Sequence, residues 1–177
     1  MRKITIISGS PNKKSRLNGV IHYAKQKLEQ NCCEISVIEV CSLPSDDLMY
    51  ANLNSKSIQR ANATVEEAAG IIVASPVYKT TYTGVLKAYL DLLPQKGFQN
   101  KIVAAYFVGG TFSNLLSIDY SLKPLLASMG CRCFAENVFA VDNQIERIED
   151  HKQNIHFHLA KEIKQRIDAS TSDLISY

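Results

Sequence analysis

The sequence predicts an α/β fold with a parallel sheet of five strands and helices on both of its faces. Short apolar or β-branched runs alternate with longer segments in which apolar residues have helical spacing. Several runs end in turn-forming residues, such as Ser8-Gly9 after the first and Gly109-Gly110 after the fourth. Strands that alternate with helices form βαβ units, so they lie parallel and buried. Five strands in 177 residues favour the order 2-1-3-4-5 of a flavodoxin-like three-layer sandwich.

The predicted strands cover residues 3–7, 34–40, 70–74, 101–108 and 131–140. The first is the β-branched run KITII, and the third is the continuous apolar run GIIVA. Continuous apolar runs of this length are typical of strands that helices cover on both sides. In the second strand, Ile35 and Val37 alternate with polar residues.

The predicted helices cover residues 18–29, 55–69, 83–93, 114–129 and 144–168. In the first of them, Val20, Ala24 and Leu28 lie on one helical face, and Pro94 closes the third. The last is a long C-terminal helix with Ile163 and Ile167 on its apolar side. We expect residues 1–170 to form one domain and residues 171–177 to be a frayed tail.

Composition excludes several classes of partner. The formal net charge is only +3, so neither nucleic acid nor a membrane surface is expected to bind. No apolar run approaches the roughly 20 residues of a membrane span. The N-terminus lacks the apolar region of roughly 7–15 residues that a secretory signal needs. These features predict a cytoplasmic protein.

The cysteines and histidines do not predict a metal site. Five cysteines are an odd number, which argues against a disulfide framework. Cys131 and Cys133 share one face of a predicted strand, but no second ligand pair lies nearby in the sequence. His156 and His158 fall on the predicted C-terminal helix, where residues two apart do not share a face.

The first loop (residues 8–17) leaves strand 1 and enters a helix. In such folds ligands bind beyond the carboxyl ends of the strands, at the switch point between strands 1 and 3. Ser8, Ser10 and Ser15 can donate hydrogen bonds to phosphate oxygens, and Arg16 can pair with them. The helix N-terminus adds a partial positive charge. The loop matches neither a Walker motif nor GxGxxG, so a monophosphate such as that of FMN fits better than a pyrophosphate. The alternative is a polar turn with a serine cap.

The second loop (residues 75–84) follows strand 3, opposite the first loop. Pro76 fixes the backbone there, and Tyr78 offers a flat apolar face. A planar flavin ring needs a rigid, partly apolar wall of this kind. The alternative is a strand-to-helix turn with Thr83 as the helix cap.

The third loop (residues 109–113) contains paired glycines, which let the edge of a ligand approach the backbone. Amides in this loop could stabilise the negative charge that develops on a reduced flavin ring. The alternative is a simple tight turn. The occurrence of all three loops at one end of the sheet is what favours a flavin site.

The motifs in these loops resemble the NAD(P)H-dependent FMN reductases. They are GSPxxxSR at strand 1, SPVYKxxYxGxLKxxLDLLP after strand 3 and GGT after strand 4. The chain is most similar to the reductase component of two-component alkanesulfonate monooxygenase systems. The stretches DLMYA at 47–51 and DYSLKP at 119–124 match as well. The resemblance covers roughly residues 1–142.

The resemblance implies a set of residues that bind FMN. For the phosphate and ribityl chain they are Ser8, Ser10, Pro11, Ser15, Arg16 and Leu17. For the ring they are Pro76, Val77, Tyr78, Lys79, Gly109, Gly110 and Thr111. No acid–base side chain is implied, because hydride passes from nicotinamide C4 to flavin N5 when the rings stack, and positioning provides the catalysis. NADPH or NADH would be the donor, and a flavin-dependent monooxygenase would receive the reduced FMN.

Pro124 predicts a local change of helix type. It lacks an N–H, so the carbonyl of Tyr120 loses its α-helical partner, and the N–H of Leu125 can serve it instead. That pairing creates a π-bulge, which is frequent at functional sites. The resembling reductases have a π-helix here at a subunit interface. We therefore expect Tyr120 to pack in a homodimer or homotetramer and to influence flavin release. The alternative is an ordinary proline kink.

Other functions are open to the same fold. One is a quinone or azo reductase that keeps FMN bound, another is a flavodoxin-like electron carrier, and a third is a flavin-binding regulatory module. Such electron carriers are usually strongly acidic, and an isoelectric point near 8.5 counts against that function. The sequence places no 2′-phosphate site, so it does not decide between NADPH and NADH.

Overall fold

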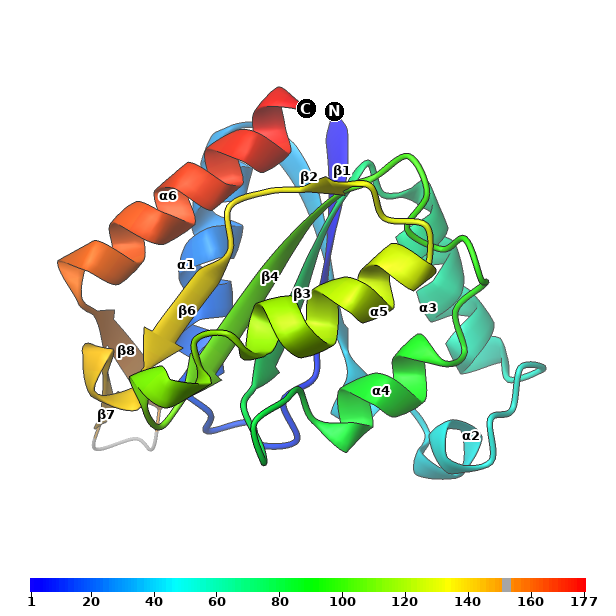
Figure 1. The fold of residues 1–177 in the computed structure, drawn as a ribbon, viewed down its shortest axis with the longest axis horizontal. Helices are drawn as coiled ribbons and strands as arrows, with labels where there is room; N and C mark the ends of the chain where they lie inside the picture. The colour runs from blue at the N-terminus through cyan, green and yellow to red at the C-terminus, as the bar shows by residue number, and fades with distance from the viewer. Residues whose placement is uncertain (151–153) are drawn as a thin grey trace.

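The computed structural model describes residues 1–150 and 154–177. Its elements follow in the order β1 (Arg2–Ser8), α1 (Leu17–Gln30), β2 (Cys33–Glu39), η1 (Val40–Ser42), α2 (Ser45–Met49), α3 (Lys56–Glu67), β3 (Gly70–Pro76), α4 (Gly84–Leu90), β4 (Ile102–Gly109), η2 (Phe112–Asn114), η3 (Ile118–Leu122), α5 (Lys123–Ser128), β5 (Cys133–Phe134), β6 (Val138–Val141), η4 (Asp142–Gln144), β7 (Ile145–Glu149), β8 (Ile155–Leu159) and α6 (Lys161–Ser176). Figure 1 shows strands and helices alternating along most of the chain.

The main sheet has the predicted order. Its strands run β2-β1-β3-β4-β5, all pairs are parallel, and β6 pairs with β4 beyond the end of β5. Every residue of β3 and β4 is buried, whereas β2 at the edge is buried only in part. The flavodoxin-like prediction is therefore confirmed. The predicted fifth strand, 131–140, is instead two short pieces separated by residues 135–137.

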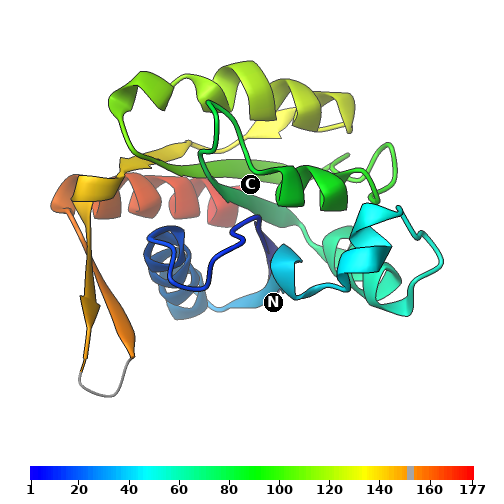
Figure 2. The same cartoon turned by 90° about the horizontal axis from the view of Figure 1, so that it is seen from below.

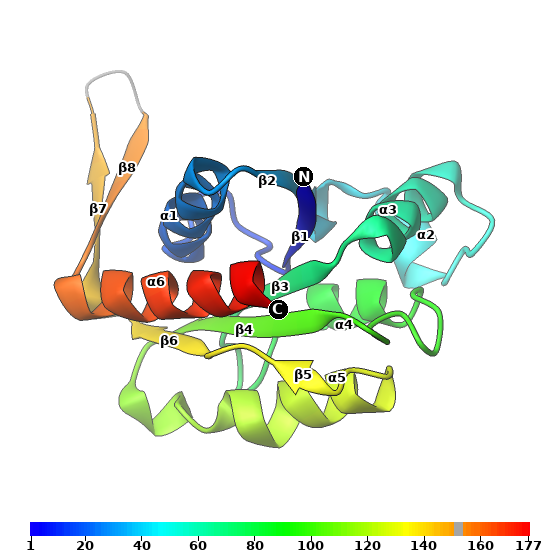
Figure 3. The ribbon, with the colours of Figure 1, turned by 90° about the horizontal axis from the view of Figure 1, so that it is seen from above.

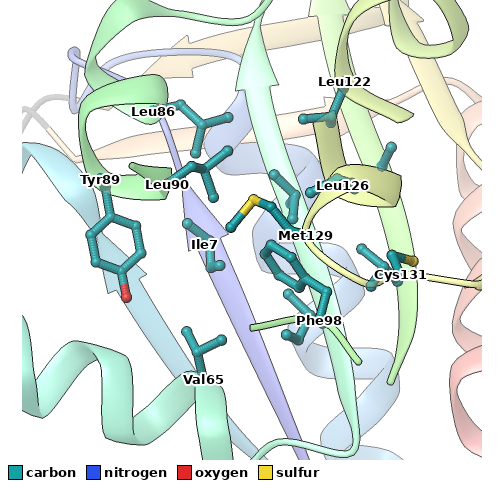
Figure 4. Packing of buried hydrophobic residues seen from close by; sticks show 14 of the residues in the cluster. Ile7, Val65, Leu86, Tyr89, Leu90, Phe98, Leu122, Leu126, Met129 and Cys131 are labelled. Atoms are coloured by element: carbon teal, nitrogen blue, oxygen red, sulfur yellow. The ribbon is translucent and has the colours of Figure 1, made fainter. Parts of the chain in front are cut away.

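Helices cover both faces of this sheet. On one face, α1 and α6 pack side by side and bury Leu17, Val20, Ile163 and Ile167 against the strands. On the other face, α3, α4 and the segment η3–α5 form a second core (Figure 3). Figure 4 shows this second core, where Leu86 and Leu90 of α4 approach Met129 and Phe98. This arrangement leaves the carboxyl ends of β1, β3 and β4 as the place where the connecting loops meet.

The predicted C-terminal helix, 144–168, is wrong for the part before α6, which begins only at Lys161. Residues 145–159 instead contain β7 and β8, which pair antiparallel and leave the body of the molecule as an arm (Figures 2 and 3); residues 151–153 of the prediction lie outside the described residues. In β8 half-buried Ile155, Phe157 and Leu159 alternate with exposed His156 and His158. This period of two is the pattern of a strand. The two histidines therefore share one face of a strand.

The frayed tail predicted at 171–177 is also wrong, because α6 continues to Ser176. Ile163, Ile167 and Leu174 are completely buried along one side of α6, and Thr171 is buried next to them. A Cβ on Gly70 would lie 3.3 Å from Leu174 Cδ2, so the end of α6 packs directly on the start of β3. The apolar stripe of the helix extends to its last turn and holds that turn against the sheet.

Candidate active site

The three loops meet at the carboxyl ends of neighbouring strands. Ser8 at the end of β1 pairs with Ala74 of β3, and Pro76 pairs with Val108 of β4. A cavity of about 200 Å³ lies between the loops. Its lining residues are Asn12, Lys14, Ser15, Arg16, Pro76, Val77, Tyr78, Val108, Gly109, Gly110, Asp142 and Arg147. In Figure 1 these loops lie at the lower end of the sheet, opposite the two chain termini.

The first loop is folded by its own polar side chains. Ser10 is only 5% exposed, and its Oγ donates to the carbonyl of Asn12 at 2.9 Å. The Asn12 Oδ1 accepts from the Lys14 amide at 2.8 Å, and the Ser15 Oγ accepts from the Leu17 amide at 3.3 Å. These bonds turn the chain sharply before α1 begins. The serine hydroxyls thus shape the loop in addition to being available as donors.

Unused backbone donors remain in this loop. Within the described chain, the amides of Ser10, Lys13 and Arg16 have no hydrogen-bond acceptor. They lie just before the N-terminus of the 14-residue helix α1, where Arg16 makes no side-chain cap bond. Free amides at the positive end of a helix are suited to bind an anion.

Arg16 is held from the far end of the chain. Its Nε donates to the carbonyl of Ile145 at 2.9 Å, Arg16 lines the cavity, and its two terminal nitrogens have no hydrogen-bond partner among the described residues. Arg147 and Asp142 also line this cavity, and neither was expected there. Arg147 falls within the helix that was wrongly predicted over residues 144–168. Residues two apart lie on the same face of a strand, so a strand prediction here would have placed Arg147 on the same face as Ile145.

The second loop contains a tight turn in an unusual conformation. The amide of Tyr78 donates to the carbonyl of Thr81 at 2.9 Å, and the Thr81 amide donates back at 3.3 Å. Lys79 and Thr80 between them have φ values of 51° and 70°. Two successive positive φ values define a type I′ turn, which normally uses asparagine and glycine. The turn leaves the Tyr78 side chain half exposed beside the cavity.

Thr83 joins the second loop to the first. Its amide donates to Ser75 Oγ at 3.0 Å, and its Oγ1 accepts from the Leu86 amide at 3.2 Å, as a cap of α4. The same hydroxyl donates to the carbonyl of Gly9 at 2.6 Å. A helix cap at Thr83 is the alternative to a ligand site in the second loop, and the structure has both the cap and the cavity. Thr83, Ser75 and Gly9 support the site without lining it.

The third loop passes close to both neighbours. A Cβ on Gly109 would lie 3.1 Å from Phe139 Cζ and 3.4 Å from Val77 Cγ2, so a larger residue would press on the wall of the cavity. Gly110, by contrast, faces open space, with no atom within 4 Å of a built Cβ. Thr111 is extended and leads into η2.

Comparison with known proteins now decides the family. The family model for NADPH-dependent FMN reductases matches residues 2–146. The chain belongs to the NADPH-dependent FMN reductase family. It is 39% identical to the FMN reductase (NADPH) of Escherichia coli strain K12 over 145 residues, which are 82% of this chain and 75% of that protein.

Two further comparisons agree with this assignment. The chain is 32% identical to the FMN reductase (NADPH) of Pseudomonas putida over 174 residues, covering 89% of this chain and 88% of that one. The apo crystal structure of an NADH:FMN oxidoreductase superposes with a TM-score of 0.87 at 28% identity, covering 99% of this chain and 89% of that one. FMN and a reduced nicotinamide nucleotide are the cofactors of the family.

The residues of this reductase fit FMN. The free amides of Ser10, Lys13 and Arg16 suit its phosphate. Pro76 and Val77 form a fixed apolar wall, because the Val77 amide is bonded to the Val108 carbonyl at 2.8 Å. The open space at Gly110 leaves room for the edge of a ring. Lys79, in contrast, is exposed at the tip of the turn and does not line the cavity, nor do Ser8, Ser10, Pro11, Leu17 and Thr111.

A π-helix lies next to the third loop of the reductase. It is η3, residues Ile118–Leu122, and Pro124 follows it at the start of α5. The sequence predicts a π-bulge at Tyr120 because of Pro124, and the observed π-helix contains Tyr120. Tyr120 in its middle is 80% exposed. Exposed apolar side chains continue from it towards the third loop: Phe112, Leu115 and Leu116.

All five cysteines are free, and burial raises the pKa of the Cys131 thiol to about 11. Among residues 1–150 and 154–177, no cluster of histidine, cysteine, aspartate and glutamate has the arrangement of a metal site. In the same residues no helix is both long and apolar enough to span a bilayer.

Proposed function

We propose that this protein oxidises NADPH or NADH and reduces FMN in the cavity between the three loops, and that it delivers the reduced FMN to a flavin-dependent monooxygenase of the alkanesulfonate type. The observation that carries the proposal is the set of unpaired amides in the first loop, at Ser10, Lys13 and Arg16, together with the apolar wall of Pro76 and Val77, which lines the same cavity as Arg16. One feature binds a phosphate, and the other supports a planar ring.

The residues of the chain act mainly by positioning. The first loop holds the phosphate through its amides and the free nitrogens of Arg16, and this fixes the position of the ribityl chain. Pro76 and Val77 support one face of the ring. When bound, FMN supplies the N5 atom that accepts the hydride. Tyr78, half exposed on the turn, lies where it can flank a nicotinamide stacked on the open face.

The openness of the site supports transfer of reduced FMN to another protein. Tyr78 beside the cavity is half exposed, and no atom lies within 4 Å of a Cβ built on Gly110, so few side chains cover a bound ring. A ligand held mostly at its phosphate can exchange without a large rearrangement. We further propose that a second copy of the chain covers Tyr120, Phe112, Leu115 and Leu116. Adjacent exposed apolar side chains of this kind commonly mark an interface.

The experiment is nicotinamide oxidation in air, with purified protein, either nucleotide and increasing FMN. Oxidation that rises with FMN and saturates is expected, and the faster nucleotide identifies the preferred donor. Arg16→Ala should raise the FMN requirement, because a charge-assisted contact worth about 1.5–3 kcal/mol is lost. Arg132→Ala is a matched control, since Arg132 also bonds backbone carbonyls but lies at the opposite end of the sheet. Tight retention of FMN with negligible nicotinamide oxidation would instead indicate an electron carrier.

A test of the partner needs the monooxygenase as well. Reduced FMN made by this protein should support oxidation of an alkanesulfonate by its monooxygenase at a lower total FMN concentration than an unrelated flavin reductase requires. Equal FMN requirements for the two reductases would contradict a dedicated partnership. That result would leave the reductase activity itself unaffected.

A further inference from the structure

The arm formed by β7 and β8 touches the first loop at three points. Arg147 Nη1 donates to the carbonyl of Lys14 at 3.1 Å, and Arg16 Nε donates to the carbonyl of Ile145 at 2.9 Å. The Lys14 ammonium lies 3.4 Å from the Glu149 carboxylate. Each contact joins residue 14 or 16 to a residue of β7. Arg16 and Ile145 are 129 positions apart in the sequence, so loop and arm are fastened to each other only in the folded chain.

The arm also rests on the start of α1. A Cβ on Gly19 would lie 2.6 Å from Phe157 Cβ and 2.7 Å from Phe157 Cγ, so the β8 side chain lies directly on the helix backbone. Only glycine permits this approach. Figure 3 shows the arm of β7 and β8 beside α1 and projecting from the body of the molecule. The arm is thus anchored on both sides of the Arg16 amide.

We propose that the arm is a positioning element that holds the first loop in the conformation that binds phosphate, with Arg147 as one of its contacts to that loop. Without it, the free amides would be held mainly by local bonds within residues 10–19, such as those of Ser10, Asn12 and Ser15 and the bond from Asn18 Nδ2 to the Lys13 carbonyl. Amides fixed before binding lose little conformational freedom when the anion arrives. The inference rests on the proposed function, since it takes the phosphate of FMN to be the anion.

This role predicts a selective effect on the phosphate. Riboflavin has the same ring and ribityl chain as FMN but no phosphate, so it does not use the phosphate-binding amides of the first loop. In Arg147→Ala the dissociation constant of FMN should rise about fivefold, equal to about 1 kcal/mol, while that of riboflavin stays the same. Flavin fluorescence quenching measures both constants. Arg132→Ala, the matched surface arginine, should change neither.

A second variant disturbs the arm at its other contact, the one with the start of α1. Gly19→Ala places a methyl group against Phe157 and must displace β8, although alanine itself favours the helix. It should likewise weaken FMN binding more than riboflavin binding. An unchanged FMN affinity in Arg147→Ala, or equal weakening of FMN and riboflavin, would overturn the positioning role.

Hydrogen exchange separates this inference from the proposed function. The amides of Ser15 and Asn18 bond to acceptors inside the first loop, at 3.0 Å each. In protein without flavin they should exchange faster in Arg147→Ala than in wild type, and at the wild-type rate in Arg132→Ala. If wild type binds no FMN, the proposed function fails, yet faster exchange would still support the coupling of arm and loop. Unchanged exchange would refute that coupling whatever the flavin affinity.

Discussion

The hydroxyl of Thr83 donates a 2.6 Å hydrogen bond to the carbonyl oxygen of Gly9, and this bond ties the second loop to the first at the edge of the cavity. Both residues are buried. The two loops come from different βαβ units, so this contact fixes the distance between the proposed ring wall and the proposed phosphate site.

Thr83→Val should destabilise the protein by about 1–3 kcal/mol, because the buried Gly9 carbonyl loses its donor and α4 loses its cap. Urea unfolding measures the change. FMN affinity should fall as well, since the two loops become free to separate. Thr83→Ser keeps the hydroxyl and is the control. Equal stability of the valine and serine variants would show that the bond contributes nothing.

Gly9→Ala and Gly110→Ala form a matched pair of glycine substitutions. A Cβ on Gly9 would lie 2.5 Å from Leu86 Cβ, so the first loop or α4 must shift, at a cost of about 1–3 kcal/mol. Gly110 faces open space, and its substitution should change the free energy of unfolding by at most about 0.5 kcal/mol. A Gly9 variant as stable as the Gly110 variant would mean that α4 does not pack closely on the first loop.

Thr80→Gly should stabilise the protein by about 1 kcal/mol, because a β-branched residue with a φ of 70° is strained and glycine is not. Thermal unfolding of the flavin-free protein is the measurement. Thr81→Gly, one position further along and outside the positive φ range, should instead be neutral or destabilising. Destabilisation by Thr80→Gly would show that contacts of the threonine side chain outweigh the backbone strain.

Asp47 should make stability depend on pH in the acid range. Hydrogen bonds from Ser55 and Asn52 lower the pKa of its carboxyl group in the folded state. A carboxyl group with a lowered folded pKa stabilises the fold above its unfolded pKa of about 3.9. This stabilisation is lost as pH falls through the folded pKa. The melting temperatures of wild type and Asp47→Asn should therefore differ near neutral pH and converge in acid.

Asp46→Asn is the control for that experiment, because Asp46 lies beside Asp47 in the first turn of α2. Any general effect of charge at a helix N-terminus is therefore common to both variants. The hydrogen bonds from Ser55 and Asn52, by contrast, go to Asp47. A pH profile of Asp47→Asn identical to that of Asp46→Asn would contradict the specific role of these two bonds.

Tyr120→Ala should reduce the oligomeric state and speed the release of FMN, if a second copy of the chain covers η3. Sedimentation velocity measures the first property and stopped-flow fluorescence the second. Tyr177→Ala removes another exposed tyrosine, far from η3 at the end of α6, and serves as control. No change in either property would remove Tyr120 from the interface.

The order of the main sheet followed from the sequence because its central strands are buried on both faces. The runs KITII and GIIVA are apolar or β-branched over most of their length, and a turn signal follows each of them, so their places and ends were both visible. The three loops at the carboxyl ends were visible for the same reason. The C-terminal arm was not, because the spacing of its isoleucines fits a helix as well as a strand, and only the pairing of β7 with β8 decides between them.

From the sequence alone follow the fold class, the family resemblance and the three loops that could meet a flavin, since these depend on local patterns of burial and turn residues. Only the tertiary structure decided which groups stand around the cavity. Arg147 bonds to Lys14 from 133 positions away, and Thr83 bonds to Gly9 across two βαβ units. Contacts of this range have no local pattern, because they depend on how the sheet brings the ends of separate strands together.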